Sequence, residues 1–161
     1  MTPPPFEPLE MLAVLEQHRV AYVVIGKLAG ILHGTGGVAD ELEICPQIKD
    51  SNLARLQRAL DELDARPNEA SQVGIKIIDG DTRLRTPIGE LALTPRPAGT
   101  RGGWDDLRRR ARREALGEGM RAPVAAIEDL VRIAAAEGVS VDEVHALRRV
   151  AEASQDRGLG R

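Results

Sequence analysis

The sequence predicts an α/β domain of the α+β type, in which helices pack on a small mixed sheet. In the first half of the chain, runs of β-branched residues alternate with amphipathic helical patterns. Short strand-like segments separated by turn residues follow, and the last third of the chain is typical of helices. The length of 161 residues is sufficient for one core with a helical extension.

The first half begins with a helix, a strand and a second, shorter helix. Apolar residues at helical spacing predict a helix over residues 7–18, and residues 22–25 indicate a buried strand that ends at Gly26. A short apolar helix is predicted over residues 27–33, and residues 35–37 form a glycine-containing loop. This order places a glycine turn directly before the start of a helix.

The next strand has one apolar and one acidic face. Leu42 and Ile44 alternate with Glu41 and Glu43, and Pro46 ends the strand. Alternation therefore directs the two carboxylates to the same side of the predicted sheet.

A helix then runs from Asp50 or Ser51, either of which can cap it, to about Ala65. The strands predicted after it are residues 73–78, 83–86 and 90–93. The first two are separated by a turn at residues 79–81 and indicate a hairpin.

The C-terminal third is predicted to be helical. The predicted helices cover residues 104–115, opened by Asp105 and Asp106, then residues 126–137, and then residues 141–153, capped by Ser140. These elements suggest a core over residues 1–97, a helical part over residues 98–154 packed on it, and a flexible tail over residues 155–161.

Composition and charge exclude several classes of protein. The net charge of −3 gives no global electrostatic case for nucleic acid, and DNA is not an expected partner. No apolar stretch approaches the ~20 residues that a membrane span needs. The N-terminus lacks the features of a signal peptide, and the single Cys45 excludes an internal disulfide, so we expect a cytoplasmic protein. The Arg-rich, Lys-poor composition suggests a bacterial source.

The order of strand, glycine turn, short helix and acidic strand resembles the minimal nucleotidyltransferases of the polymerase-β-like superfamily, in particular the abortive-infection toxin type. The segments that carry the resemblance are residues 25–34, 38–46, 52–60, 86–93, 104–107 and 127–130. The resemblance implies a nucleotidyltransferase-like fold, with Gly26 and Lys27 as nucleotide-binding positions. It also implies that Glu41 and Glu43 are the catalytic and metal-binding positions.

The chain departs from the family pattern at the residues that carry the chemistry. Lys27 stands at the second turn position, Glu41 and Glu43 replace two aspartates, and Ala92 replaces the third. Mg²⁺ demands near-ideal octahedral geometry, and each glutamate moves its oxygens outward by about one methylene. Either the two glutamates hold one weak Mg²⁺, or the Lys27 ammonium pairs with them and closes the site without a metal; Lys27 could instead contact a nucleotide phosphate.

Three hypotheses about function follow. The first is a divergent nucleotidyltransferase-fold protein with impaired or no catalysis, which acts as a nucleotide-binding, regulatory or toxin-like module. The second is an active Mg-dependent enzyme that moves a nucleoside monophosphate from an NTP to RNA (tRNA) or protein. The third is an interaction domain without a nucleotide site, in which Lys27 is paired with the two glutamates. Glu41 and Glu43 could also be no more than the solvent face of an edge strand. A cognate protein or RNA is a candidate partner, and an arginine run offers the RNA contact: Arg108, Arg109, Arg110, Arg112 and Arg113.

Overall fold

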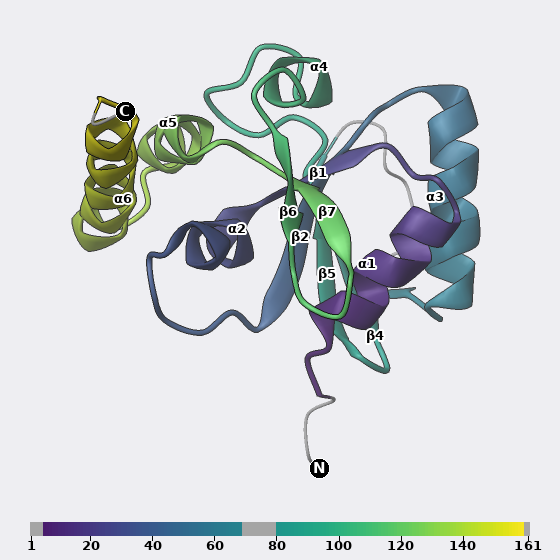
Figure 1. The fold of residues 1–161 in the computed structure, drawn as a ribbon. Helices are drawn as coiled ribbons and strands as arrows, with labels where there is room; N and C mark the ends of the chain where they lie inside the picture. The colour runs from purple at the N-terminus through teal and green to yellow at the C-terminus, as the bar shows by residue number, and fades with distance from the viewer. Residues whose placement is uncertain (1–4, 69–79, 160–161) are drawn as a thin grey trace.

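The computed structural model of the chain describes residues 5–68 and 80–159 (Figure 1). The first elements are α1 (Pro8–Gln17), β1 (Tyr22–Ile25), α2 (Gly26–His33), β2 (Glu41–Pro46), α3 (Asp50–Glu62) and β3 (Arg66–Pro67). They are followed by β4 (Thr82–Thr86), β5 (Gly89–Leu93), α4 (Trp104–Leu107), β6 (Arg112–Ala115), β7 (Arg121–Val124), α5 (Ile127–Glu137) and α6 (Val141–Leu159). The strand predicted over residues 73–78 lies outside the described residues.

The strands form one mixed sheet in the order β3-β4-β5-β2-β1-β7-β6. β2 pairs with β5 and β1 pairs with β7 in parallel, and the other neighbours are antiparallel. Figure 1 shows α1 and α3 on one side of the sheet and α2, α5 and α6 on the other. The predicted α/β fold class with a mixed sheet is therefore confirmed.

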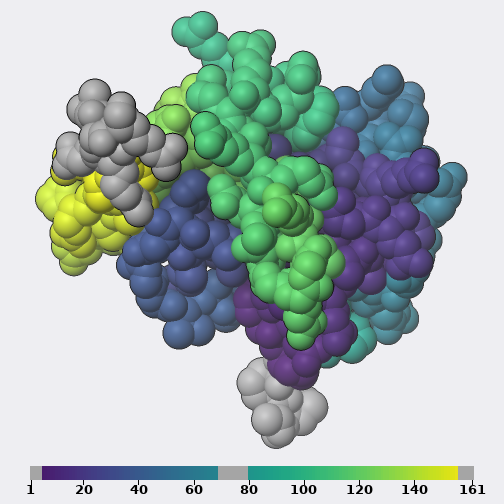
Figure 2. Space-filling view, viewed as in Figure 1, coloured from purple at the N-terminus to yellow at the C-terminus, as the bar shows by residue number. Residues whose placement is uncertain are grey.

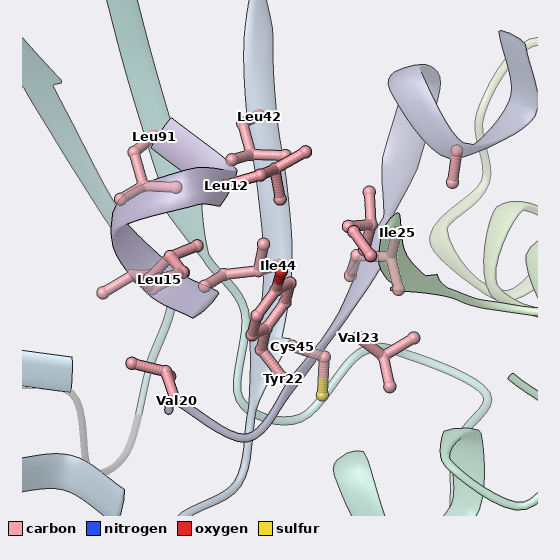
Figure 3. Close-up of a cluster of buried hydrophobic side chains, with 14 of the residues drawn as sticks. Leu12, Leu15, Val20, Tyr22, Val23, Ile25, Leu42, Ile44, Cys45 and Leu91 are labelled. Atoms are coloured by element: carbon pink, nitrogen blue, oxygen red, sulfur yellow. The ribbon is translucent and has the colours of Figure 1, made fainter. Parts of the chain in front are cut away.

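The core is built from aliphatic side chains on both faces of the central strands. All four residues of β1 are buried, because helices cover both of its faces. Figure 3 shows Leu12 and Leu15 of α1 packed over the sheet near Ile44 and Leu91. These four side chains are at most 1% exposed, so α1 seals the face of the sheet opposite α2.

The helix predicted over residues 104–115 is wrong beyond Leu107. Residues 112–115 form β6, which pairs with β7, and β7 in turn pairs with β1. Gly117, Glu118 and Gly119 all have positive φ and make the hairpin turn. Helix propensity is a weak preference that sheet pairing overrides here. The sheet thus includes strands from both sides of the boundary predicted at residues 97 and 98, and the division into two parts stays a prediction.

Two predicted helix ends also differ from the structure. Lys49 occupies the N-cap position of α3, and neither Asp50 nor Ser51 makes a capping hydrogen bond there. α6 continues to Leu159, so most of the tail predicted from residue 155 is helical. By contrast, Ser140 caps α6 as predicted, because its Oγ accepts a hydrogen bond from the Glu143 N–H at 3.2 Å. No helix in the described part of the chain is long and apolar enough to cross a membrane.

Asn52 joins α3 to the ends of two strands. Its side chain is fully buried and accepts a hydrogen bond from the Ala21 N–H at 2.7 Å. Its amide group donates to the carbonyl oxygens of Ala21 and Gln47, each at 2.9 Å. One buried amide therefore satisfies three backbone groups that would otherwise lack partners.

We predict that Asn52→Leu lowers the free energy of unfolding by about 2–4 kcal/mol, because it leaves these backbone groups buried and unpaired. Urea denaturation measures the change. Ser51→Ala, at the neighbouring exposed position, is the control and should stay within about 0.5 kcal/mol of the natural protein. Equal effects of the two substitutions would contradict the role assigned to Asn52.

Candidate functional site

Gly26 lies at the junction of β1 and α2 and has a φ of +75°, in the left-handed region. A Cβ at this position would overlap Glu43 Oε1 and lie 3.1 Å from the Glu43 Cβ. Glycine is thus required both for the backbone conformation and for the close approach of β2. The turn predicted at Gly26 is present and brings the start of α2 against the acidic strand.

A cavity of about 540 Å³ opens beside this junction, between the sheet and the helices α2, α5 and α6. It is lined by all four site residues predicted from the sequence, Gly26, Lys27, Glu41 and Glu43. Its opposite wall comes from α5 and α6 and combines apolar side chains, among them Leu130, Ile133 and Leu147, with the carboxylates of Glu137 and Glu143. Figure 2 shows the surface of α6 beside that of α2.

The strand register decides which side chains lie beside the two glutamates. In the parallel pair of β2 and β5, Glu43 is opposite Ala92 and Glu41 is opposite Glu90. In the next pair, Ala92 is opposite Arg83 of β4. The position at which the family resemblance implies a third carboxylate therefore adjoins Glu43, but it carries a methyl group.

Arg83 provides the cation that contacts the acidic pair. Its Nη1 donates to Glu41 Oε2 at 3.4 Å. Arg83 lies on β4 and Glu41 on β2, so this contact crosses β5 at the level of Ala92, whose side chain is small. One of the alternatives for Lys27 gave it this role, but within the described residues Lys27 forms no ion pair with Glu41 or Glu43. Lys27 lines the cavity, and its role stays a prediction.

The sequence alone contained only a weak signal for Arg83. The alternation of Arg83 and Arg85 with buried residues indicates a strand with a charged face. Which acidic residue Arg83 reaches depends on the pairing of β4, β5 and β2. Local patterns do not determine that pairing.

Burial raises the pKa of Glu43, and the carboxylates of Glu137 and Asp81 raise it further. Two contacts act in the other direction. Thr94 Oγ1 donates to Glu43 Oε2 at 2.6 Å, and the charge of Arg83 also lowers the pKa. Glu43 is therefore a partly desolvated carboxylate whose hydrogen-bond partner is a neutral hydroxyl.

Burial also raises the pKa of Glu41, and Arg83 opposes this effect. The charges of Glu43, Glu90 and Asp40 add to the rise. On the far side of the cavity, burial and Asp81 raise the pKa of Glu137. Negative charges are thus crowded around this cavity, and proton uptake relieves part of their repulsion.

The residues at this site do not fit a pair of Mg²⁺ ions. Two-metal catalysis needs carboxylates that bridge ions about 3.5–4 Å apart. Ala92 supplies no oxygen, and Arg83 already contacts Glu41. Among residues 5–68 and 80–159, no three His, Cys, Asp or Glu side chains are placed to hold a metal.

Other candidate residues from the sequence have structural contacts. His33 Nε2 donates to the Ala125 carbonyl oxygen at 2.8 Å and joins α2 to the end of β7. In the arginine run, Arg110 contacts Asp106 and Asp129, and Arg113 contacts Glu16 at 3.0 Å. Contact of this run with RNA stays a prediction.

The sheet order and the helix positions define the nucleotidyltransferase fold. The chain is similar to the lincosamide antibiotic adenylyltransferase LnuA in its lincomycin-bound form, with a TM-score of 0.64, 11% identity, and coverage of 92% of this chain and 98% of that one. A putative nucleotidyltransferase (TM1012) from Thermotoga maritima gives a TM-score of 0.55 at 19% identity, over 93% and 88% of the two chains. The antibiotic-resistance factor ANT(2'')-Ia gives 0.58 at 11% identity, over 89% and 80%.

Sequence comparison adds no closer relative. No protein-family model matches the chain. No curated protein is significantly similar to it in sequence. The similarity to solved structures therefore shows the fold alone, and an activity has to be argued from the residues of the site.

We predict that Gly26→Ala destabilises the protein by about 2–4 kcal/mol, because the added methyl group meets Glu43 and the backbone has a positive φ. Gly36→Ala is the matched control, since Gly36 has a φ of +78° and open space around it. It should cost only about 1 kcal/mol for the backbone. Thermal and urea unfolding measure both variants, and equal losses would show that Glu43 does not crowd Gly26.

The raised pKa of Glu43 leads to a prediction about pH. The charged carboxylate is disfavoured in the folded protein, so Glu43 stabilises the fold below its ordinary pKa of 4.5, and this contribution is lost as the pH rises through the folded value. Glu43→Gln should therefore raise the melting temperature at pH 7.5, and the gain should shrink to zero near pH 4.5. Glu152→Gln on the exposed face of α6 is the control. A gain that is independent of pH would contradict this explanation.

Proposed function

We propose that this protein is a nucleotidyltransferase-fold binding module that does not catalyse two-metal nucleotidyl transfer. One observation carries the proposal: Ala92 lies beside Glu43 where a third carboxylate would be needed, and Arg83 contacts Glu41 from the next strand. The four predicted site residues line one cavity, but the ligand set for two metal ions is incomplete.

The chemistry of transfer depends on the missing groups. The two ions have to stabilise both the attacking and the leaving oxygen, and a carboxylate normally bridges them. The methyl group of Ala92 can neither bridge ions nor accept a proton from the attacking group. A divalent ion at Glu41 would also compete with the guanidinium of Arg83, and burial raises the pKa of both glutamates, which disfavours the charged forms that bind a metal. These effects all act against metal binding.

The cavity remains large enough for a ligand of small-molecule size. Proteins of similar fold include LnuA with lincomycin bound and ANT(2'')-Ia in complex with adenylyl-2''-tobramycin. These structures support a ligand-binding role for this chain. We propose that this chain keeps such a role as a regulatory or toxin-like module, with a nucleotide, an RNA (tRNA) or a cognate protein as the candidate partner.

The alternative is an active Mg-dependent nucleotidyltransferase. The observation in its favour is that Gly26, Glu41 and Glu43 line one cavity. In that case the two glutamates would hold one Mg²⁺, and the ion would supply charge stabilisation to the phosphate of an NTP. Glu41→Ala and Glu43→Ala should then each abolish transfer.

Melting temperatures with each of the four NTPs, with and without Mg²⁺, separate these proposals. A ligand at 100 times its Kd adds about 2.7 kcal/mol of stability, which is readily measured. We expect no Mg-dependent shift for the natural protein. We expect such a shift to appear in a variant that combines Glu41→Asp, Glu43→Asp and Ala92→Asp with Arg83→Ala.

The same variant with Ala92→Asn is the matched control, because asparagine has the shape of aspartate without its charge. A Mg-dependent shift of the natural protein with one NTP, lost in Glu43→Ala, would overturn the proposal and favour the enzyme. Transfer of label from α-³²P NTP provides the second readout.

A further inference from the structure

A second cavity of about 370 Å³ lies at the other end of β2 from the two glutamates. It opens just beyond the carboxyl ends of β2 and β5, which are parallel neighbours. Ligands of open α/β sheets commonly bind beyond the carboxyl ends of parallel strands. This cavity shares no lining residue with the cavity around Glu41 and Glu43.

One wall of the cavity is fixed by a close backbone approach. Gly103, directly before α4, has a φ of +58°, and a Cβ there would overlap the Pro95 carbonyl oxygen. The Cys45 thiol also donates to this oxygen, at 3.6 Å. The segment before α4 is thus held against the end of β5, and this packing sets the position of Trp104 at the cavity.

An ion-pair network around the buried Asp106 holds the same segment from behind. Asp106 accepts hydrogen bonds from the Arg101 N–H at 2.8 Å and from Arg110 Nη2 at 2.7 Å. It also forms an ion pair with Arg132 of α5 at 2.9 Å. Burial alone would raise the pKa of Asp106, but these three partners lower it to about 2. The wall that carries Trp104 is therefore preformed.

The charges at the cavity favour an anion. Lys49 and Arg96 line it and are exposed, and among the described residues neither forms an ion pair. The one carboxylate of the lining, Asp105, already contacts Arg108 at 3.5 Å. The guanidinium of Arg108 also lies over the Trp104 ring, 5.1 Å from its centroid. Two unpaired cations therefore face the cavity beside a half-buried indole ring.

We infer that this cavity binds a small molecule that joins an anionic group, carboxylate or phosphate, to a flat aromatic ring. The anion would contact Lys49 and Arg96, and the ring would pack against Trp104 and Pro95. A cavity of this volume accommodates such a molecule, and its apolar residues supply the ring contact. The inference is independent of the proposed function, because it uses none of the residues around Glu43.

Trp104 makes the test direct, because the chain has one tryptophan. The probes are phenyl phosphate and phenylacetate, which carry both features. Benzyl alcohol lacks the charge, benzylammonium reverses it, and inorganic phosphate lacks the ring. We expect a saturable change in Trp104 fluorescence with at least one of the two aromatic anions, at a Kd at least tenfold lower than for the three controls. The preferred aromatic anion identifies the source of the charge.

Calorimetry with the same probes distinguishes binding from collisional quenching. Lys49→Gln and Arg96→Gln should each raise the Kd about tenfold, and Arg148→Gln on α6 should leave it unchanged. Melting temperatures of the three variants check that they fold. Equal affinity for benzyl alcohol and the aromatic anions, unchanged affinity in both cavity variants, or the absence of binding by calorimetry would each overturn the inference.

Discussion

The parallel pairing of β2 with β5 is the interaction on which the candidate site depends. It places Ala92 beside Glu43 and continues one residue past the end of β5, where the Thr94 N–H donates to the Ile44 carbonyl oxygen at 2.9 Å. That continuation brings the Thr94 hydroxyl to the Glu43 carboxylate. β4 then adds Arg83 at the level of Ala92. The contacts of the acidic pair with Thr94 and Arg83 therefore come from neighbours across the sheet rather than from residues near it in sequence.

The weakness of the contact with Arg83 explains why the pKa values of Glu41 and Glu43 remain raised. Arg83 is 67% exposed, and ion pairs that reach solvent are worth at most about 1 kcal/mol. Desolvation of the two glutamates acts against their charged forms, and their acidic neighbours add to it. One exposed guanidinium is too weak to offset both effects. The two cavities consequently differ in character: carboxylates dominate at one end of β2, and unpaired cations at the other.

Local patterns were sufficient to predict the first half of the fold. The buried strand at residues 22–25, the turn at Gly26 and the two-faced strand at Glu41 follow from periods of two and 3.6 residues, and the structure contains all three. The prediction of a helix over residues 104–115 was wrong because its arginines suit a helix, whereas the glycines at 117 and 119 form a hairpin turn. The contacts of Arg83 and Asn52 are beyond local patterns, since each depends on strands distant in sequence.

The ion-pair network that holds α4 is separate in this chain from the residues of the acidic cavity. Asp106 of α4 and Asp129 of α5 are buried and bind Arg110 and Arg132, so they fasten α4 to α5, and neither lines the acidic cavity. Gly26 does line that cavity, but it acts through the backbone and its fit against β2. None of these contacts requires a metal ion or a nucleotide. Because these contacts do not involve the side chain at position 92, the scaffold can keep its shape while the chemistry of the site changes.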